Sequence, residues 1–215
     1  MNLRAMLAEF LGVFTLCFVA LGAIAATQGS DPVVVALAPG LAVGLSVAAL
    51  GPVSGAHFNP AVTFALLLSG RTSWAEALGY WGVQLLGGLV AAFFVGALYG
   101  GEAVFEGTPA PGEAYSAVQA LMMEVFLTFF LVSVILGTAV YNRYTFAGLA
   151  IGLAVTMAIL VGAPISEAAM NPARVLGPAL IGGEWSAHWV YWLGPLVGAG
   201  LAAFVYEFLY PRANL

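Results

Sequence analysis

Two copies of an Asn-Pro-Ala tripeptide are the residues whose types and spacing point most directly to chemistry. Asn59-Pro60-Ala61 and Asn171-Pro172-Ala173 each precede a short apolar run. Asparagine is a favoured N-cap and proline a favoured first helical residue, so each copy predicts the start of a helix. Each predicted helix has about 11 residues and is about 16 Å long, roughly half of a bilayer's hydrocarbon core. One copy alone would be an ordinary helix cap, whereas two copies at matching points of a repeat indicate a shared site.

The composition indicates a membrane protein. Hydrophobic residues make up 62% of the 215 residues, charged residues make up 7%, and the mean hydropathy is +1.02. A soluble domain has about 25% charged residues, so we expect lipid to cover much of this surface. The net charge of −5 and the absence of lysine argue against nucleic-acid binding. The single cysteine, Cys17, offers neither a disulfide partner nor a thiolate metal cluster, and we predict no cofactor.

Six apolar stretches each reach or nearly reach the ~20 residues that a helix needs to cross a bilayer. Helices are required because backbone polar groups in lipid must be satisfied internally. The first stretch is too long and too uniform for a signal sequence, so we expect it to be retained. The predicted spans are about Leu3–Thr27, Pro32–Leu50, Trp74–Tyr99, Tyr115–Tyr141, Phe146–Ala163 and His188–Leu209.

The arginines predict the orientation. Arg4, Arg71, Arg143 and Arg212 flank spans, and with six spans all four lie on one side of the membrane. Arginine near the ends of spans favours the cytoplasmic side, so both termini are predicted to be cytoplasmic, in a multi-pass protein of the plasma or inner membrane. The loops on the other side carry only acidic charges, which are Asp31, Glu102, Glu106, Glu113 and Glu184.

The chain also repeats itself. Leu7–Leu11, around Glu9, matches Met122–Phe126, around Glu124, and Gly40–Leu45 matches Gly148–Leu153. Each half reads span, span, Asn-Pro-Ala segment, span, and because three spans is an odd number the second half must lie inverted in the membrane. We therefore predict one transmembrane channel domain over residues 1–215, with a first repeat over about 1–99, an extracellular connection over about 100–114 and a second repeat over about 115–215.

This pattern predicts an all-α membrane fold in which two half-helices meet at mid-membrane as a broken seventh span. Two positive dipole ends of about half a charge each would then face one point, where the amides of Asn59 and Asn171 offer N–H donors to a passing oxygen. The non-helical approaches, Ser54–Phe58 and Ser166–Met170, are tolerated at this depth only where they are buried or line a wet cavity. Such a path suits small neutral hydrogen-bonding molecules and opposes cations and protons. The predicted pore-lining loop residues are Gly55, Ala56, His57, Phe58, Glu167, Ala169 and Met170.

Ser54–Val62 and Met170–Arg174 resemble the two signature loops of the major intrinsic protein family, the aquaporins and glycerol facilitators. The resemblance covers the whole chain and is more aquaporin-like than glycerol-facilitator-like. It implies a homotetramer with one pore per subunit and passive flow that excludes protons and ions. It also places Arg174 at the extracellular constriction. The other constriction positions that it implies are Pro39, Ile159 and Ala168.

The constriction departs from that of the family's strict water channels, which place an aromatic residue at the first position and a histidine at the second. Pro39 and Ile159 stand there instead, which predicts a wider and less polar filter. Isoleucine and alanine beside arginine resemble members associated with ammonia or urea, while Val175 stands where glycerol facilitators have an aspartate. We therefore predict water as the permeant, with ammonia, urea and glycerol as further candidates.

Four other ionisable residues need an explanation. Glu9 and Glu124 lie inside spans, where a carboxylate is costly. We expect each to accept hydrogen bonds from the half-helix loop of its own repeat, and a proton relay is the alternative. His57 is expected to support the first loop, with a cytoplasmic pH gate as the alternative. Glu167 is expected to pair with Arg174 or to pin its loop, and the alternative is that it neutralises Arg174 in the pore and weakens cation exclusion.

Two other functions compete with a channel. A secondary transporter also uses inverted repeats and broken helices, but the spans offer few polar residues to bind a coupling ion. A structural membrane protein of the same fold would conduct nothing. No catalytic residue set and no metal-ligand spacing is recognised, so neither an enzyme nor a metal site is predicted.

Overall fold

The computed structural model describes residues 2–210, and this part of the chain is helical without any strand. It contains six helices that are long and apolar enough to cross a membrane, which confirms the predicted fold class. The two half-helices have 9 and 11 residues. In chain order the elements are α1 Leu3–Thr27, α2 Pro32–Ser54, α3 Pro60–Leu68, α4 Trp74–Tyr99, α5 Gly101–Glu106, α6 Ala117–Ile135, η1 Leu136–Tyr141, α7 Ala147–Ser166, α8 Pro172–Gly182 and α9 Val190–Leu209.

The predicted spans match these helices to within a few residues at their ends. The second span continues past Leu50 to Ser54 although Pro52 removes one helical hydrogen bond. The fourth span ends in a π-helical turn, η1, which was not predicted from the sequence. The short helix α5, within the connection between the repeats, was not predicted either.

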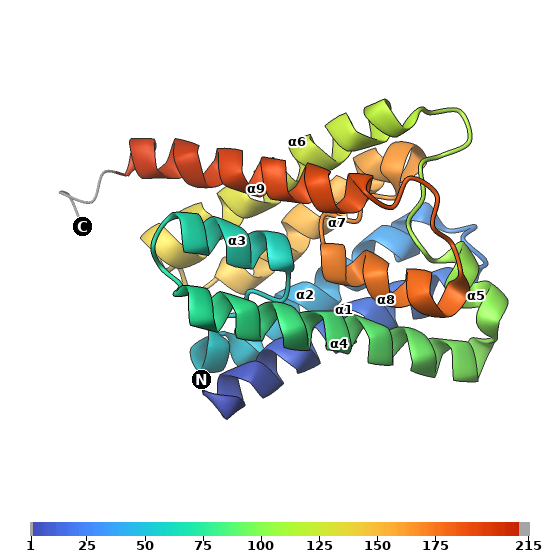
Figure 1. Ribbon diagram of the computed structural model, residues 1–215, viewed down its shortest axis with the longest axis horizontal. Coiled ribbons are helices and arrows are strands. Elements are labelled where there is room, and N and C mark those ends of the chain that lie inside the picture. Colours follow the sequence, from blue (N-terminus) through green and yellow to red (C-terminus); the bar gives the residue numbers. More distant parts are fainter. Residues whose placement is uncertain (1, 211–215) are drawn as a thin grey trace.

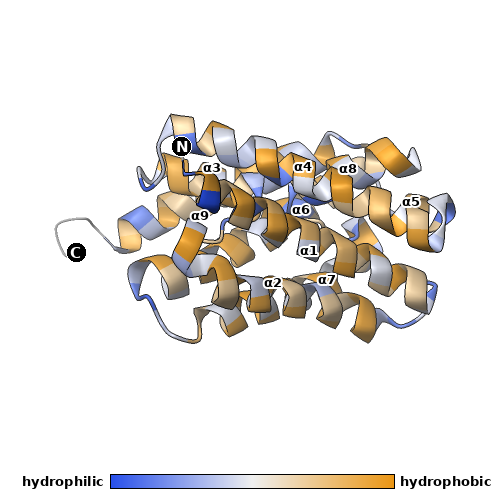
Figure 2. Ribbon diagram, turned by 90° about the horizontal axis from the view of Figure 1, so that it is seen from below, coloured by the Kyte–Doolittle hydropathy of each residue, from blue (hydrophilic) through white to orange (hydrophobic). Residues whose placement is uncertain are grey.

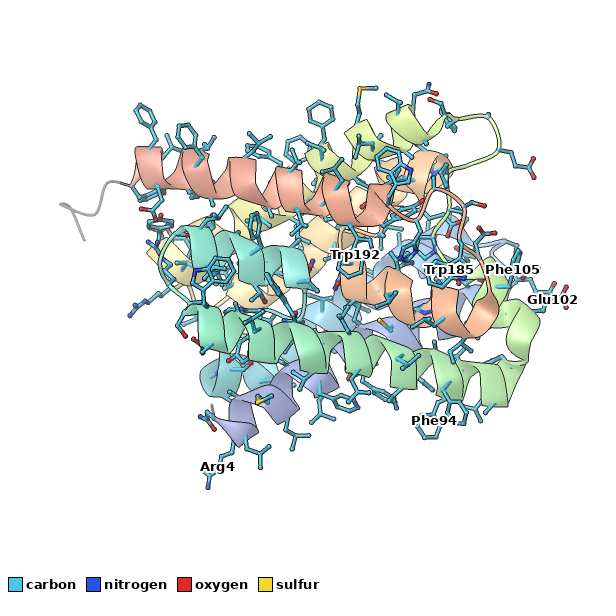
Figure 3. All side chains as sticks on the ribbon, viewed as in Figure 1. Arg4, Phe94, Glu102, Phe105, Trp185 and Trp192 are labelled. Carbon is cyan, nitrogen blue, oxygen red and sulfur yellow. The ribbon has the colours of Figure 1, made fainter. Side chains whose placement is uncertain are left out.

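The chain enters and leaves the bundle at the same end, where α1 begins and α9 ends (Figure 1). We call this the terminal end, and we call the other one the α5 end. Arg4 lies at the terminal end, whereas Glu102, Phe105 and Trp185 gather at the α5 end (Figure 3). Arg212, used above to predict the orientation, lies outside the described residues.

The two halves of the chain pack in the same way. Helix α1 packs on α4 in the first half and α6 packs on α9 in the second, while α2 and α7 pack on each other across the repeat. Each half-helix packs mainly on the last span of the other half, α3 on α9 and α8 on α4. The half-helices lie between these spans in the middle of the bundle (Figure 1). Because the halves exchange their half-helices in this way, neither half can build the centre alone.

Close contact between α2 and α7 depends on small residues. A Cβ atom added to Gly152 would lie 2.5 Å from the carbonyl oxygen of Gly40, and one added to Gly148 would lie 2.7 Å from that of Gly44. Such small-residue faces let helix backbones approach each other within a membrane. The Gly-x-x-x-Gly spacings of both helices are therefore used for packing.

The helices are mostly hydrophobic along their length, as the hydropathy colouring shows (Figure 2), and many large apolar side chains lie on the outer surface. Large side chains such as Phe94, Phe204 and Phe208 are exposed on it, the last with 80% of its surface. A soluble protein rarely exposes a continuous apolar surface of this kind, so lipid or further subunits must cover it.

We predict that Gly152→Ala destabilises the protein by about 1–3 kcal/mol, because its new methyl group meets backbone that cannot move aside. Gly82→Ala on α4 is the matched control, since nothing lies within 4 Å of its added Cβ. This control should be neutral or gain up to about 1 kcal/mol from helix propensity. Unfolding in detergent can be followed with a thiol-reactive dye, because Cys17 is completely buried in the folded protein. Equal melting temperatures for the two variants would contradict this packing argument.

Candidate pore

The two half-helices meet amino end to amino end through their asparagines. The Nδ2 atom of Asn59 donates to the carbonyl of Met170 at 2.7 Å, and that of Asn171 donates to the carbonyl of Phe58 at 2.9 Å. Each asparagine also caps its own helix, because its Oδ1 accepts from the N–H of Ala61 or Ala173. The two repeats are thus joined reciprocally at the point where both helices start.

This arrangement leaves each asparagine with one N–H donor for a permeating molecule. An amide nitrogen has two N–H groups, and one from each asparagine is used across the junction. The second N–H of each remains, and both side chains line a narrow cavity. The sequence predicts that both amides face a passing oxygen, and the structure leaves one N–H of each asparagine for that. The positive ends of two helix dipoles lie at the same place.

Glu9 anchors the first loop. Its Oε1 accepts from the hydroxyl of Ser54 at 2.7 Å and from the N–H of His57 at 3.0 Å. Its Oε2 accepts from the N–H of Phe58 at 2.7 Å and from the amide of Gln84 at 2.8 Å. This side chain is completely buried, and four donors surround its two oxygens.

Glu124 does the same in the second repeat. Its Oε1 accepts from the hydroxyl of Ser166 at 2.8 Å and from the N–H of Ala169 at 2.9 Å, and its Oε2 accepts from the N–H of Met170 at 2.7 Å. Both carboxylates therefore bind the two N–H groups just before an Asn-Pro-Ala tripeptide. Glu124 too is completely buried, so neither carboxylate borders the water path that a proton relay would use.

The carboxylates hold a strained backbone. In the first loop Ala56 and Phe58 have φ angles of 52° and 49°, and in the second loop Ala168 and Met170 have 50° and 53°. Non-glycine residues in this left-handed region cost on the order of 1 kcal/mol or more each and persist only where their surroundings hold them. The hydrogen bonds to Glu9 and Glu124 supply that hold.

His57 belongs to the support of the first loop. Its Nδ1 lies 3.1 Å from the hydroxyl of Thr63, which also accepts from the amide of Gln84 at 3.0 Å. The edge of its ring meets Tyr80, with the ring centroids 5.0 Å apart. His57 also lines the cavities on both sides of this loop, so its ring borders the path.

Three cavities follow one another through the molecule. A narrow one of about 40 Å³ passes the two asparagines. It shares His57 and Val62 with a wide vestibule of about 700 Å³ at the terminal end. At the α5 end it shares Ile159 and Arg174 with a cavity of about 220 Å³. Since one water needs about 10–15 Å³ of such a cavity, the narrow part has room for a few waters and nothing bulky.

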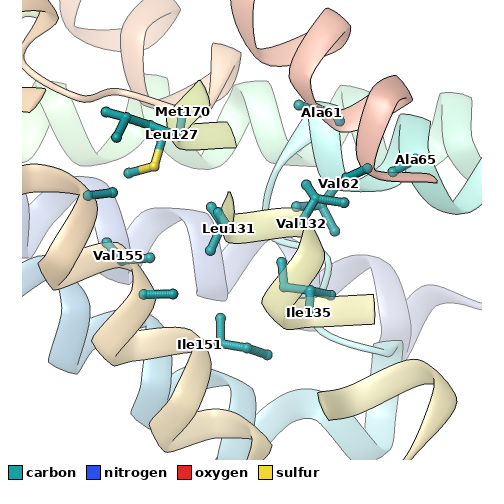
Figure 4. Close-up of a cluster of buried hydrophobic side chains, with 14 of the residues drawn as sticks. Ala61, Val62, Ala65, Leu127, Leu131, Val132, Ile135, Ile151, Val155 and Met170 are labelled. Atoms are coloured by element: carbon teal, nitrogen blue, oxygen red, sulfur yellow. The ribbon is translucent and has the colours of Figure 1, made fainter. Parts of the chain in front are cut away.

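Apolar side chains form the wall opposite the loops. Leu131 and Ile135 of α6 and Ile151 and Val155 of α7 line the narrow cavity, and they belong to one buried cluster (Figure 4). Hydrocarbon walls bind no water, so the polar groups along this path come from the loops and from Arg174.

The four positions of the expected constriction all line the narrow cavity, as do the loop residues 56–58, 169 and 170. Pro39 comes from α2, Ile159 from α7, Ala168 from the second loop and Arg174 from α8. Arg174 keeps only 6% of its surface exposed, and among the described residues its Nε and Nη1 have no hydrogen-bond partner. Gly55 lies in the wall of the terminal vestibule instead, and Glu167 in that of the cavity at the α5 end.

Glu167 forms no ion pair with Arg174, since the only ion pair among residues 2–210 joins Arg71 to Glu207. Its carboxylate accepts from the N–H of Ala110 in the connection between the repeats. Burial raises the pKa of Glu167 to about 7, against the lowering effect of the Arg174 charge and of that hydrogen bond. The hydrogen bond to Ala110 is the kind of contact that a loop-pinning role predicts, and that role stays a prediction.

Sequence reasoning did not identify several contributors to the site. Gln84 and Thr63 complete the support around Glu9 and His57, and Leu131 and Val155 form part of the apolar wall. An amide within an otherwise apolar span is a signal that could have singled out Gln84. Nothing in the sequence distinguishes the wall residues from those that face lipid.

We predict that Glu9→Gln lowers the free energy of unfolding by about 1–3 kcal/mol, because the new amide brings N–H groups against backbone N–H donors. The measurement is dye reaction with Cys17 during heating. Glu102→Gln, an exposed carboxylate on α5, is the control and should leave stability unchanged. If a pH gradient drove solute uptake in the wild type and not in Glu9→Gln, the loop-support role would be wrong and a relay would be supported.

Comparison with known proteins agrees with this geometry. The family model of the major intrinsic proteins matches residues 1–206. A probable aquaporin TIP3-2 of Arabidopsis thaliana is 43% identical, over 97% of this chain and 84% of its own length. Aquaporin NIP1-1 of rice, Oryza sativa subsp. japonica, is 41% identical, over 96% of this chain and 74% of its own length. The structure of the aquaglyceroporin from Plasmodium falciparum superposes with a TM-score of 0.85 at 25% identity and covers 95% of both chains. The chain therefore belongs to the major intrinsic protein family of membrane channels.

Proposed function

We propose that this channel conducts water passively in both directions and that its constriction also admits small neutral solutes, with ammonia, urea and glycerol as the candidates. The observation that carries the proposal is the junction of the two half-helices beside a series of three cavities that share lining residues. Asn59 and Asn171 stand at its narrowest part with one N–H each to spare.

The physical basis of selection is the arrangement of donors and charge. A water oxygen passing the junction accepts from the asparagine amides, while the apolar wall of α6 and α7 offers nothing to hold it. The positive ends of two helices and the guanidinium of Arg174 oppose cations and protons by charge. The chain thus needs no moving part to admit neutral molecules and reject ions.

The apolar lining of the constriction supports solutes beyond water. Pro39, Ile159 and Ala168 present hydrocarbon to the path, so Arg174 is the only one of the four that donates hydrogen bonds from its side chain. A filter with one polar side rejects solutes mainly by size. We therefore expect the filter to pass small neutral molecules such as ammonia and urea as well as water.

The two competing functions find less support. A coupled transporter needs polar groups that bind and release an ion, and the buried carboxylates Glu9 and Glu124 are occupied by loop N–H groups. A structural protein would have no use for a cavity that passes the junction. Flux measurements decide between these functions and a channel.

We further propose that the terminal end is cytoplasmic and that four copies assemble, each with its own pore. Arg71 and Arg143 line the vestibule at the terminal end. Arginine near the ends of spans favours the cytoplasmic side, which supports this orientation. One chain contains every wall of the path, so each subunit of the proposed homotetramer would conduct independently.

We expect proteoliposomes with the wild-type chain to shrink in a stopped-flow osmotic jump far faster than empty liposomes. Val155→Trp should return the rate to near that of empty liposomes, because an indole would fill the narrow cavity that Val155 lines. Met157→Trp on the same helix faces outward with 47% of its surface exposed and should keep the wild-type rate. Wild-type flux equal to that of empty liposomes would refute the channel.

The proposed breadth of the filter has a separate test. Pro39→Phe with Ile159→His would bring an aromatic ring and an imidazole into the constriction, as in the family's strict water channels. We expect urea flux to fall to the level of empty liposomes while water flux persists, because urea is larger than water. Swelling in an inward urea gradient measures this. Unchanged urea flux would show that these positions do not set the limit.

A further inference from the structure

Glu167 occupies a position for which the fold itself does not require a carboxylate. The loops Ser54–Asn59 and Ser166–Asn171 correspond residue by residue, and Gly55 is the counterpart of Glu167. Gly55 has a φ of 85° and Glu167 a φ of 55°, so both backbones are left-handed. Glycine adopts this conformation freely, whereas glutamate pays a conformational cost there. The carboxylate is therefore present for a reason other than the turn.

The surroundings of Glu167 place it just outside the constriction. It lines the cavity of about 220 Å³ at the α5 end together with Ile159 and Arg174, which also line the narrow part of the path. Glu106 of α5 lines the same cavity. A solute that enters from this end passes through a cavity lined by both Glu167 and Arg174 before it reaches the narrow part.

Arg174 lacks a direct partner for its charge. Only 6% of its surface is exposed. Two of the three guanidinium nitrogens, Nε and Nη1, have no hydrogen-bond partner among the described residues. Glu167 is close enough to interact with it electrostatically but does not form an ion pair with it. Charge offset without contact leaves the donors of Arg174 free for a solute.

We propose that Glu167 is a specificity-determining residue of the channel: from the cavity outside the constriction, its carboxylate offsets the charge of Arg174 and so sets how strongly this entrance rejects small cations. The inference rests on the proposed function, because it assumes that the path conducts. It assigns to the carboxylate a role in selection that the neutral counterpart, Gly55, does not have in the terminal vestibule.

The offset depends on pH. Burial raises the pKa of Glu167 to about 7, while Arg174 on α8 lowers it and Glu184 after α8 raises it. The other titratable groups that face Glu167 are Glu106 on α5, across the cavity, and Tyr191 on α9. Below pH 7 the carboxyl is neutral and Arg174 acts as a full cation. Above pH 7 the carboxylate is charged, and cation rejection weakens.

The test compares two solutes of the same size and planar shape, guanidinium, which is charged throughout this pH range, and urea, which is neutral. Fluxes of both, and of water, are measured in the same proteoliposomes at pH 6 and pH 8. The variants are Glu167→Gln, which keeps an acceptor for the Ala110 N–H, and Glu167→Gly, which introduces the residue that its counterpart Gly55 has in the first repeat. Glu102→Gln removes an exposed carboxylate from the same end and is the control.

At pH 8 we expect guanidinium flux relative to water flux to be about tenfold higher in the wild type than in either Glu167 variant, the effect of a unit charge on the order of 10 Å away at an effective dielectric constant of 20. At pH 6 the three proteins should converge, and Glu102→Gln should follow the wild type throughout. Equal ratios at pH 8, or a difference that is as large at pH 6, would overturn the inference. Should the Gln variant fail to fold, the Gly variant decides the comparison alone. Loss of wild-type water flux would instead refute the proposed channel.

Discussion

The structure depends on one reciprocal interaction, the pair of hydrogen bonds by which each asparagine amide reaches the carbonyl of the opposite loop. The two half-helices come from different repeats and begin halfway across the bundle, so their starts would separate without a link at this point. The carbonyls of Phe58 and Met170 can accept these bonds because both residues are left-handed. That conformation in turn requires the carboxylates Glu9 and Glu124. The buried carboxylates thus hold the loops, and the loops hold the junction of the two half-helices.

The same carboxylates decide which backbone groups remain for the path. Each residue offers one N–H and one carbonyl, and the N–H groups of His57, Phe58, Ala169 and Met170 are bound by Glu9 or Glu124. The loops are left with carbonyls as their spare polar groups, and acceptors along the wall suit water, which donates to them while its oxygen meets the asparagine amides. Burying a charged carboxylate in a membrane costs free energy. Here the two carboxylates bind the loop N–H groups, which would otherwise be free to bind a permeating molecule.

The sequence alone predicted the parts of this fold that depend on length and polarity. Spans follow from apolar runs, the half-helices from Asn-Pro-Ala before runs too short to cross, and inversion from an odd number of spans per half. It could not separate Leu131 or Val155, which line the path, from Phe94, which faces outward, because lipid, core and pore wall are all apolar surroundings. It also missed the partnership of Gln84 with Glu9, since no local pattern relates residues 75 positions apart.

The inverted repeat explains why the two entrances can differ. Two equal halves would build two equal entrances, and the loops do share their serine, their carboxylate anchor and their backbone conformation. They differ where side chains border the path: Val62 stands where the second repeat has Arg174, and Gly55 where it has Glu167. At these two positions the terminal vestibule of about 700 Å³ has small neutral residues, whereas the cavity of about 220 Å³ at the α5 end has Glu167 and Arg174. The scaffold is symmetric and these path-lining residues are not, which is why our proposal places selection at the α5 end.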